Sequence, residues 1–271
     1  MKIGYVVATP DVTTPLMPAV RGAFRDNLMF LKDLGFDGVE LATRDTAAFD
    51  KDELRRTLEE TGLEPSLIGT APISYQDEIE ICHPEADVRA KAMERLFGHI
   101  DFAGELGCPV NIGRFRGNFL EDERRAESEG WMWDGLRAGA DRAGERGVKM
   151  LFEPHHRFNT NFVRSTREGL EFLDEMNHEA VGFLIDSFHM NIEDASFSGA
   201  IREAGDRIDY FHIADNMRTY PGSGHIPFDE IIGALKEVGY AGYLSAQLAQ
   251  KPDFETASTK TIEYLYLGLR R

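Results

Sequence analysis

The chain has 271 residues, which suffices for two average domains or for one α/β barrel. Hydrophobic residues make up 42% and charged residues 28%, a composition that predicts an ordered chain with a large core. Lys and Arg total 30 against 47 Asp and Glu, and the net charge of −17 disfavours binding to nucleic acid or to anionic membranes.

Short apolar runs alternate with longer segments of helical period along the whole chain. The runs predict strands at residues 3–8, 38–41, 65–68, 110–112, 149–153, 181–186, 208–212 and 243–247. The remaining segments predict helices at residues 19–34, 51–61, 85–106, 121–146, 166–176, 195–204, 228–238 and 254–269. Many helical segments are followed by Gly, which readily takes the left-handed conformation at a helix end.

Eight strand–helix units in one unbroken chain predict a (β/α)8 TIM barrel, a single domain that spans residues 1–271. A doubly wound open sheet is the alternative, and such a sheet usually has a Gly-rich turn after its first strand. Here the turn reads Ala8-Thr9-Pro10-Asp11, so the barrel is favoured.

Nothing in the sequence indicates secretion or membrane insertion. The two cysteines, Cys82 and Cys108, are too few for a disulfide framework or a Cys-x-x-Cys site. The first apolar run is too short for a signal peptide, and no stretch approaches 18 apolar residues. We therefore expect a soluble, cytoplasmic protein.

Polar side chains end the last four predicted strands. These are Glu153, Asp186, His212 and Gln247. In a barrel the strands end together at the face that carries the active site. A single acid there is more often a helix N-cap, and a single His a hydrogen-bonded core residue. Four such residues on consecutive strands favour a divalent-metal site, with Mn²⁺ the first choice and Mg²⁺, Co²⁺ or Zn²⁺ as alternatives.

Several motifs carry a resemblance to a known family. The segments GFDGVELATRD, EPHHRF, LIDSFHMNIED and HIADNMRTYPGSGH are similar to those of the xylose-isomerase-like sugar isomerases and epimerases. The subgroup resembled most is the ketose 3-epimerase and 5-keto-L-gluconate epimerase type. The resemblance covers essentially the whole chain and implies a metal-dependent enzyme. Its expected substrate is a keto sugar or keto sugar acid, converted by α-proton abstraction through an enediolate.

The resemblance also implies roles for individual residues. Glu153, Asp186 and His212 match metal ligands, and Glu153 matches the catalytic base. The residues expected to hold the substrate are His189, Arg218, Arg116 and His225. The pair His155-His156 follows Glu153-Pro154 directly and is a further substrate-binding candidate that could also supply an acid or base.

The chain departs from the family pattern at three positions. The fourth metal ligand in these epimerases is Glu, but here it is Gln247, which cannot accept a proton near pH 7. Asn159 and Asn161 also replace acids of the subgroup resembled. One base is enough for isomerisation or for β-elimination from a keto sugar or 3-keto-glycoside. A lyase and a sugar-binding pseudoenzyme therefore remain alternatives to an isomerase or epimerase.

Four arginines, Arg114, Arg116, Arg157 and Arg218, fall in the expected rim loops of an acidic protein. Such a pattern is consistent with an anionic substrate or with ordinary salt bridges. The expected partner is a small sugar or sugar acid, without nucleic acid or membrane, and a homo-oligomer is left open. A DNA-repair endonuclease of the same superfamily would require a multi-zinc histidine cluster and a basic surface.

Overall fold

Eight parallel strands close into a barrel in which each strand pairs with its neighbours in chain order, from β1 round to β8 and back to β1. The computed structural model describes residues 1–270. The strands are β1 (Lys2–Ala8), β2 (Gly38–Ala42), β3 (Glu64–Gly69), β4 (Val110–Ile112), β5 (Met150–Phe152), β6 (Val181–Asp186), β7 (Ile208–Ile213) and β8 (Tyr243–Ala246).

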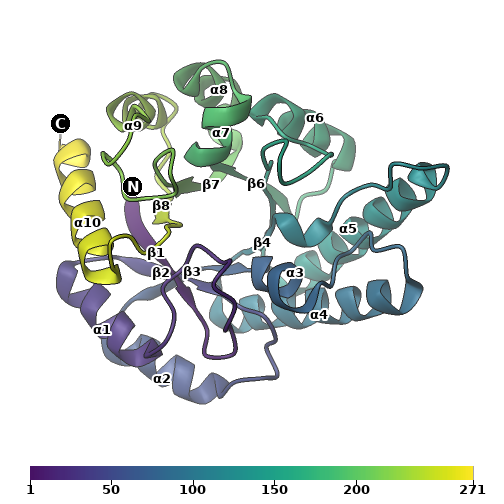
Figure 1. Cartoon of the computed structure of the whole chain (residues 1–271), viewed down its shortest axis with the longest axis horizontal. Helices are drawn as coiled ribbons and strands as arrows, with labels where there is room; N and C mark the ends of the chain where they lie inside the picture. The colour runs from purple at the N-terminus through teal and green to yellow at the C-terminus, as the bar shows by residue number, and fades with distance from the viewer. Residues whose placement is uncertain (271) are drawn as a thin grey trace.

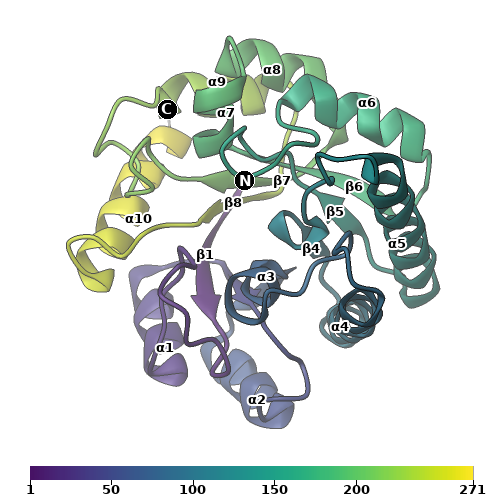
Figure 2. The same cartoon turned by 45° about the vertical axis from the view of Figure 1, so that its right-hand side comes forward.

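Helices surround this barrel, as Figures 1 and 2 show. The α-helices are α1 (Phe24–Leu34), α2 (Lys51–Thr61), α3 (Ala71–Asp77), α4 (Ala86–Leu106), α5 (Arg125–Arg146), α6 (Thr166–Met176), α7 (Ser187–Glu193), α8 (Phe197–Ala204), α9 (Phe228–Glu237) and α10 (Phe254–Arg270). Two 3₁₀ helices are η1 (Arg114–Arg116) and η2 (Gly205–Arg207).

The helix ends follow the local sequence. The Asp50 carboxylate accepts hydrogen bonds from the backbone N–H groups at the start of α2. Gly35 has a φ of 91° and ends α1, a left-handed conformation that costs a glycine little. Such sharp ends keep the connections to the next strand short, so that every helix folds back along the barrel.

The main core lies between the strands and the helices, where the outward-facing apolar side chains of both are buried. A smaller cluster fills the inside of the barrel and consists of Leu67, Leu151, Leu184 and Tyr210. The barrel is therefore a packed core and not a pore. Polar residues can be buried inside it only where they find partners.

The eight predicted strands and the single-domain barrel are confirmed. The helices differ from expectation in some of their first residues and in two short additional helices. α1 begins at Phe24 and not at residue 19, because Val20 forms an isolated bridge with Val7 of β1. The short helices α3 and α7 follow β3 and β6 directly and lack a long helical period that would have predicted them.

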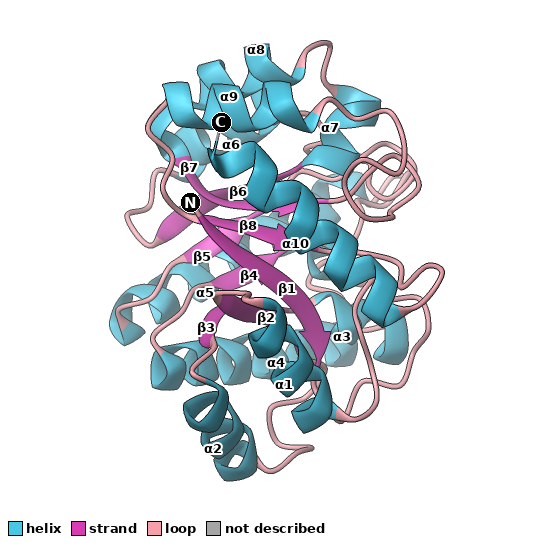
Figure 3. Cartoon of the chain, turned by 90° about the vertical axis from the view of Figure 1, so that its left-hand side faces the viewer, coloured by secondary structure: helices cyan, strands magenta, loops and turns pink. Residues whose placement is uncertain are grey.

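Long loops gather at the end of the barrel towards which the strand arrows point (Figure 3). This is the end at which the last four strands present their polar residues. No helix within residues 1–270 is both long and apolar enough to cross a membrane.

Candidate functional site

Four side chains lie where the last four strands end. Glu153 directly follows β5, Asp186 is the last residue of β6, His212 lies in β7, and Gln247 directly follows β8. The sheet register pairs Asp186 with His212. Each of the four residues is at most 7% exposed. Since neighbouring parallel strands end at the same face, the four side chains lie around a common space.

Three of these residues form a candidate metal centre. One ligand atom each from Glu153, Asp186 and His212 lies within 4.8 Å of the others. His212 Nδ1 is 3.2 Å from Glu153 Oε1 and 4.0 Å from Asp186 Oδ2. Two buried carboxylates require nearby positive charge, and carboxylate oxygens with an imidazole nitrogen suit a divalent cation. The donor set therefore fits the ion that the sequence predicts.

Gln247 joins this group through Arg218. The Arg218 guanidinium donates one nitrogen both to Asp186 Oδ2 at 2.6 Å and to Gln247 Oε1 at 2.9 Å. Its other terminal nitrogen lies 3.0 Å from His189 Nε2, and the guanidinium covers the Phe188 ring at 4.3 Å. Arg218 thus places positive charge beside the candidate ligands.

The loop after β7 holds Arg218 in this position. Arg218 has a φ of 55°, which is uncommon for a residue with a long side chain. The buried carboxylate of Asp215 accepts hydrogen bonds from the backbone N–H groups of Gly222, Gly224 and Ile226. These bonds fold the loop back on itself and so fix the backbone that carries the guanidinium.

Sequence analysis missed Glu40 of β2, which belongs to the same centre. Glu40 is 1% exposed, and His212 Nε2 donates to its Oε2 over 2.7 Å. The Ser245 hydroxyl donates to the same oxygen at 3.2 Å. A carboxylate that binds the second nitrogen of a ligating histidine fixes the orientation of its ring. The sequence signal that could have identified it is a single acidic residue within the apolar run 38–41.

The charges of the centre shift its titration. Burial opposes the charged form of His212, but the carboxylates of Glu40 and Glu153 raise its pKa to about 10. Burial alone would raise the pKa of Glu153, yet the His155 and His212 imidazoles hold it well below its usual range. Burial lowers the pKa of His189, which favours a neutral imidazole that can act as a hydrogen-bonding group or ligand.

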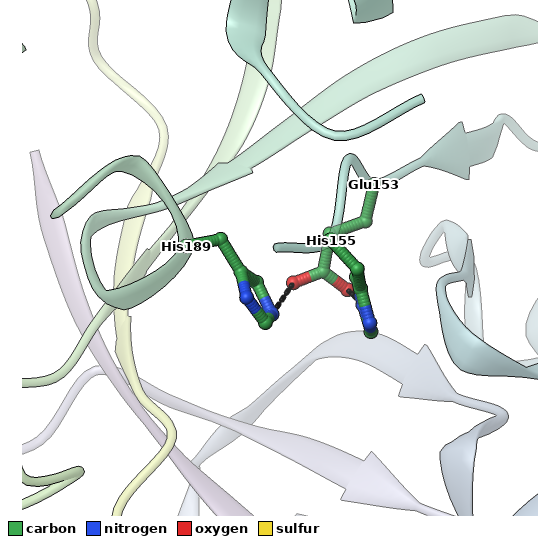
Figure 4. Close-up of side chains that lie close together, drawn as sticks. All are labelled: Glu153, His155 and His189. Atoms are coloured by element: carbon green, nitrogen blue, oxygen red, sulfur yellow. Dashed lines mark ion pairs between the residues drawn. The ribbon is translucent and has the colours of Figure 1, made fainter. Parts of the chain in front are cut away.

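Two further histidines, His155 and His189, lie beside the Glu153 carboxylate (Figure 4), and their rings stack on each other with centroids 4.3 Å apart. His155 Nε2 is 3.1 Å from Glu153 Oε2, and His189 Nε2 is 4.0 Å from Oε1. Asn111 of β4, another residue that sequence analysis missed, donates to Oε2 over 2.7 Å. Asn111 Oδ1 and His155 Nδ1 are buried without a hydrogen-bonding partner. These atoms are available to a bound ligand.

A cavity of about 500 Å³ opens above the centre, a size typical of small-molecule sites. Glu153, Gln247, Arg218, His155 and His156 all line it. The cavity also has an apolar wall made of residues 15–19. Of the sequence-predicted catalytic and metal residues, Glu153, Gln247 and Arg218 line the cavity, and Asp186, His212 and His189 lie in contact with them.

Two predicted substrate-binding residues lie elsewhere. Arg116 is fully buried, and its guanidinium donates to the backbone carbonyls of Gly113, Glu153, Phe162 and Val163. Its position at a substrate mouth was wrong, because the side chain turns inward and ties two loops together. His225 is exposed, bonds to Asn191 at 3.1 Å and does not line the cavity.

Comparisons with known proteins agree with this architecture. A family model described as a xylose isomerase-like TIM barrel matches residues 28–266. A ketose 3-epimerase of Arthrobacter globiformis is 29% identical over 78% of this chain and 72% of its own. A 3-dehydro-D-guloside 4-epimerase of Escherichia coli is 26% identical over 82% and 87%. The solved D-allulose 3-epimerase of Methylomonas has a TM-score of 0.82 at 22% identity, covering 99% and 98%.

Proposed function

The chain belongs to the xylose isomerase-like TIM barrel family, and we propose that it is a divalent-metal-dependent isomerase or epimerase of a keto sugar or keto sugar acid. The observation that carries the proposal is the buried group of Glu153, Asp186 and His212 at the floor of a small-molecule cavity. Two relatives named as sugar epimerases support the same class of enzyme. In each case the aligned region covers most of this chain and most of the relative.

The metal would be held by Glu153, Asp186 and His212, with the Gln247 amide oxygen as the fourth donor. His212 would use Nδ1, since its Nε2 is bound to Glu40. When bound, a divalent cation supplies Lewis acidity to the substrate carbonyl and so makes the adjacent C–H bond more acidic. Mn²⁺ suits a donor set of mainly oxygen atoms with one imidazole.

Glu153 is the base that removes the proton next to the carbonyl. Its low pKa keeps it ionised at neutral pH, and Asn111 and His212 fix the directions of its two oxygens. A base oriented in advance loses little entropy when it reaches the C–H bond. The resulting enediolate of the substrate is stabilised by positive charge already in place.

Arg218 and His189 hold the substrate oxygens on which negative charge develops. The guanidinium and the imidazole lie 3.0 Å apart beside the candidate ligands. His189 is buried, and Arg218 is half-buried in the cavity wall, so limited contact with water strengthens their interaction with the developing charge. His155 and His156 line the same wall and would contact the sugar hydroxyls.

The return of the proton decides which product forms. Among residues 1–270, the acids that line the cavity are Glu153 and Glu40, and Glu40 is engaged by His212. Gln247 stands where a second acid would reach the opposite face of the enediolate, and an amide cannot deliver a proton there. If Glu153 returns the proton to the same face of the enediolate, but at the neighbouring carbon, the result is isomerisation by a 1,2-proton shift.

A lyase is the second candidate, and Gln247 is the observation that favours it. β-Elimination from a keto sugar or a 3-keto-glycoside also needs one base on one face. The amide oxygen of Gln247 accepts a hydrogen bond from Arg218, so this side chain remains part of the site without a carboxylate. A sugar-binding pseudoenzyme would keep the cavity and bind without turnover.

The test is proton exchange in D₂O. The Mn²⁺-loaded protein is incubated with a panel of ketoses and keto sugar acids, and deuterium at the α-carbon is followed by NMR. We expect exchange that is lost with a chelator and falls at least about 1,000-fold in Glu153→Gln, as for removal of a catalytic base. Unchanged exchange in Glu153→Gln would refute the mechanism, and release of an aglycone or water would identify the lyase.

The cellular setting follows from the same proposal. We propose a cytoplasmic enzyme that acts on a small sugar or sugar acid. This setting is consistent with its net charge of −17 and with the lack, among residues 1–270, of a helix that could cross a membrane. Nucleic acid is an unfavourable partner for such a surface. Size-exclusion chromatography with light scattering would show whether the enzyme forms a homo-oligomer.

A further inference from the structure

Three cationic side chains stand in the outer wall of the cavity. Arg21 comes from the loop after β1, Arg114 from the end of β4, and Lys251 from the loop after β8. None of the three forms an ion pair within the described chain, whereas many arginines of the surface helices do, among them Arg25, Arg55, Arg142 and Arg202. These three cationic side chains line the same cavity of a protein whose net charge is −17.

Four arginines were expected near the site, and three of them are occupied. Arg157 pairs with a glutamate of α7 at 2.8 Å, and Arg218 pairs with Asp186 at 2.6 Å. Arg116 is buried, and its guanidinium donates hydrogen bonds to backbone carbonyls. Arg114 alone of the four combines a place in the cavity wall with a guanidinium that has no ion pair or hydrogen bond among residues 1–270.

Arg114 is held in place by its surroundings. It is the first residue of η1, directly after the turn that follows β4. Its guanidinium lies over the Tyr75 ring at 5.0 Å, and its Nε is buried without a partner. Stacking on an aromatic ring restricts a guanidinium and leaves its edge free for a planar anion.

The acids of the cavity do not neutralise this group. Glu40 and Glu153 lie on the floor, where both bind His212. The Glu80 carboxylate is attracted by Arg114 but does not line the cavity, and no ion pair joins the two side chains within residues 1–270. The cavity therefore has a metal-binding floor and a cationic outer wall, which are separated by a volume of about 500 Å³.

We infer that Arg114 binds an anionic group of the substrate, with Arg21 and Lys251 adding to the attraction. The inference rests on the proposed function, because it places the carbonyl of the substrate at the metal centre and its anionic end at the outer wall. A guanidinium recognises a carboxylate or a phosphate through the same paired N–H donors. The substrate class is accordingly a keto sugar with a terminal carboxylate or phosphate.

The experiment compares three ligands with the same carbon chain. D-Fructose, D-fructuronate and D-fructose 6-phosphate are titrated calorimetrically into the Mn²⁺-loaded protein. We expect one of the two anions to bind about 10–100-fold more tightly than D-fructose, the gain typical of charged hydrogen bonds. The two anionic ligands show whether the site takes a carboxylate or a phosphate.

Variants then assign the preference to Arg114. Arg114→Gln should lower the affinity for the preferred anion at least about 10-fold more than the affinity for D-fructose, whereas Arg114→Lys should retain part of the anion preference. Arg56→Gln on α2 is the control, since it makes the same charge change at an exposed position outside the cavity. If Arg114→Gln does not fold, the exposed pair Arg21→Gln and Lys251→Gln should still reduce the preference.

Three results would overturn the inference. They are equal binding of all three ligands, an equal loss for neutral and anionic ligands in Arg114→Gln, and no binding of any of them. Proton exchange with a neutral ketose in D₂O tests the proposed function separately. Exchange without an anion preference would therefore reject this inference and leave the proposed function standing.

Discussion

Replacing Glu40 by Gln should weaken metal binding, although it removes none of the proposed metal ligands. The substitution keeps the size of the side chain and removes the charge that His212 Nε2 contacts at 2.7 Å. Both residues are at most 1% exposed, so solvent does not compensate for the loss. Partners of this kind typically change metal affinity by about 10–100-fold, or about 1.4–2.7 kcal/mol.

The assay is competition for Mn²⁺ with a fluorescent chelator at fixed pH. Glu64→Gln is the matched control, because Glu64 also bonds to side chains but lies at the opposite end of the barrel and is about half exposed. We expect a weaker Kd in Glu40→Gln only, with thermal unfolding of the metal-free proteins measured in parallel. An unchanged Kd in Glu40→Gln would refute the role given to Glu40.

Other predictions concern the fourth donor, the thiols and the barrel wall. Gln247→Glu should bind Mn²⁺ more tightly, since the donors gain a negative charge. It should also raise inversion at the deprotonated carbon relative to exchange with retention, as followed by NMR in D₂O. If neither change occurs, the role given to the amide is contradicted. Burial raises the pKa of both Cys82 and Cys108 to about 12, so alkylation at pH 8 should be slow in the native protein and should reach two thiols after denaturation. Rapid native labelling would show that the thiols are accessible. Gly182→Ala would place a methyl group against an Asp209 carboxylate oxygen and the Leu151 side chain. We therefore expect a loss of about 1–3 kcal/mol in the free energy of unfolding, measured by urea denaturation, and an unchanged midpoint would contradict this packing.

Periodicity predicted the barrel because each strand is a short apolar run followed by a helical segment. The same logic located Glu153, Asp186, His212 and Gln247, since a polar residue that ends an apolar run lies at the end of a barrel strand. Distance along the chain was no obstacle, because the closed sheet places consecutive strand ends side by side.

The residues that were missed lie inside strands or depend on side-chain direction. Glu40 and Asn111 interrupt apolar runs in β2 and β4, and only the closed barrel shows that they reach His212 and Glu153. Arg116 follows β4, as the sequence predicts, but it lies in η1, and the sequence does not reveal that its side chain turns inward. Pair contacts between distant strands decide such directions, and a single sequence does not contain them.

Anomalous diffraction from crystals soaked in Mn²⁺ tests the central claim most directly. The account predicts one strong peak that lies between Glu153, Asp186 and His212 Nδ1 and is lost in Asp186→Asn. The absence of a peak there at saturating Mn²⁺, or an ion bound only elsewhere on the chain, would contradict it.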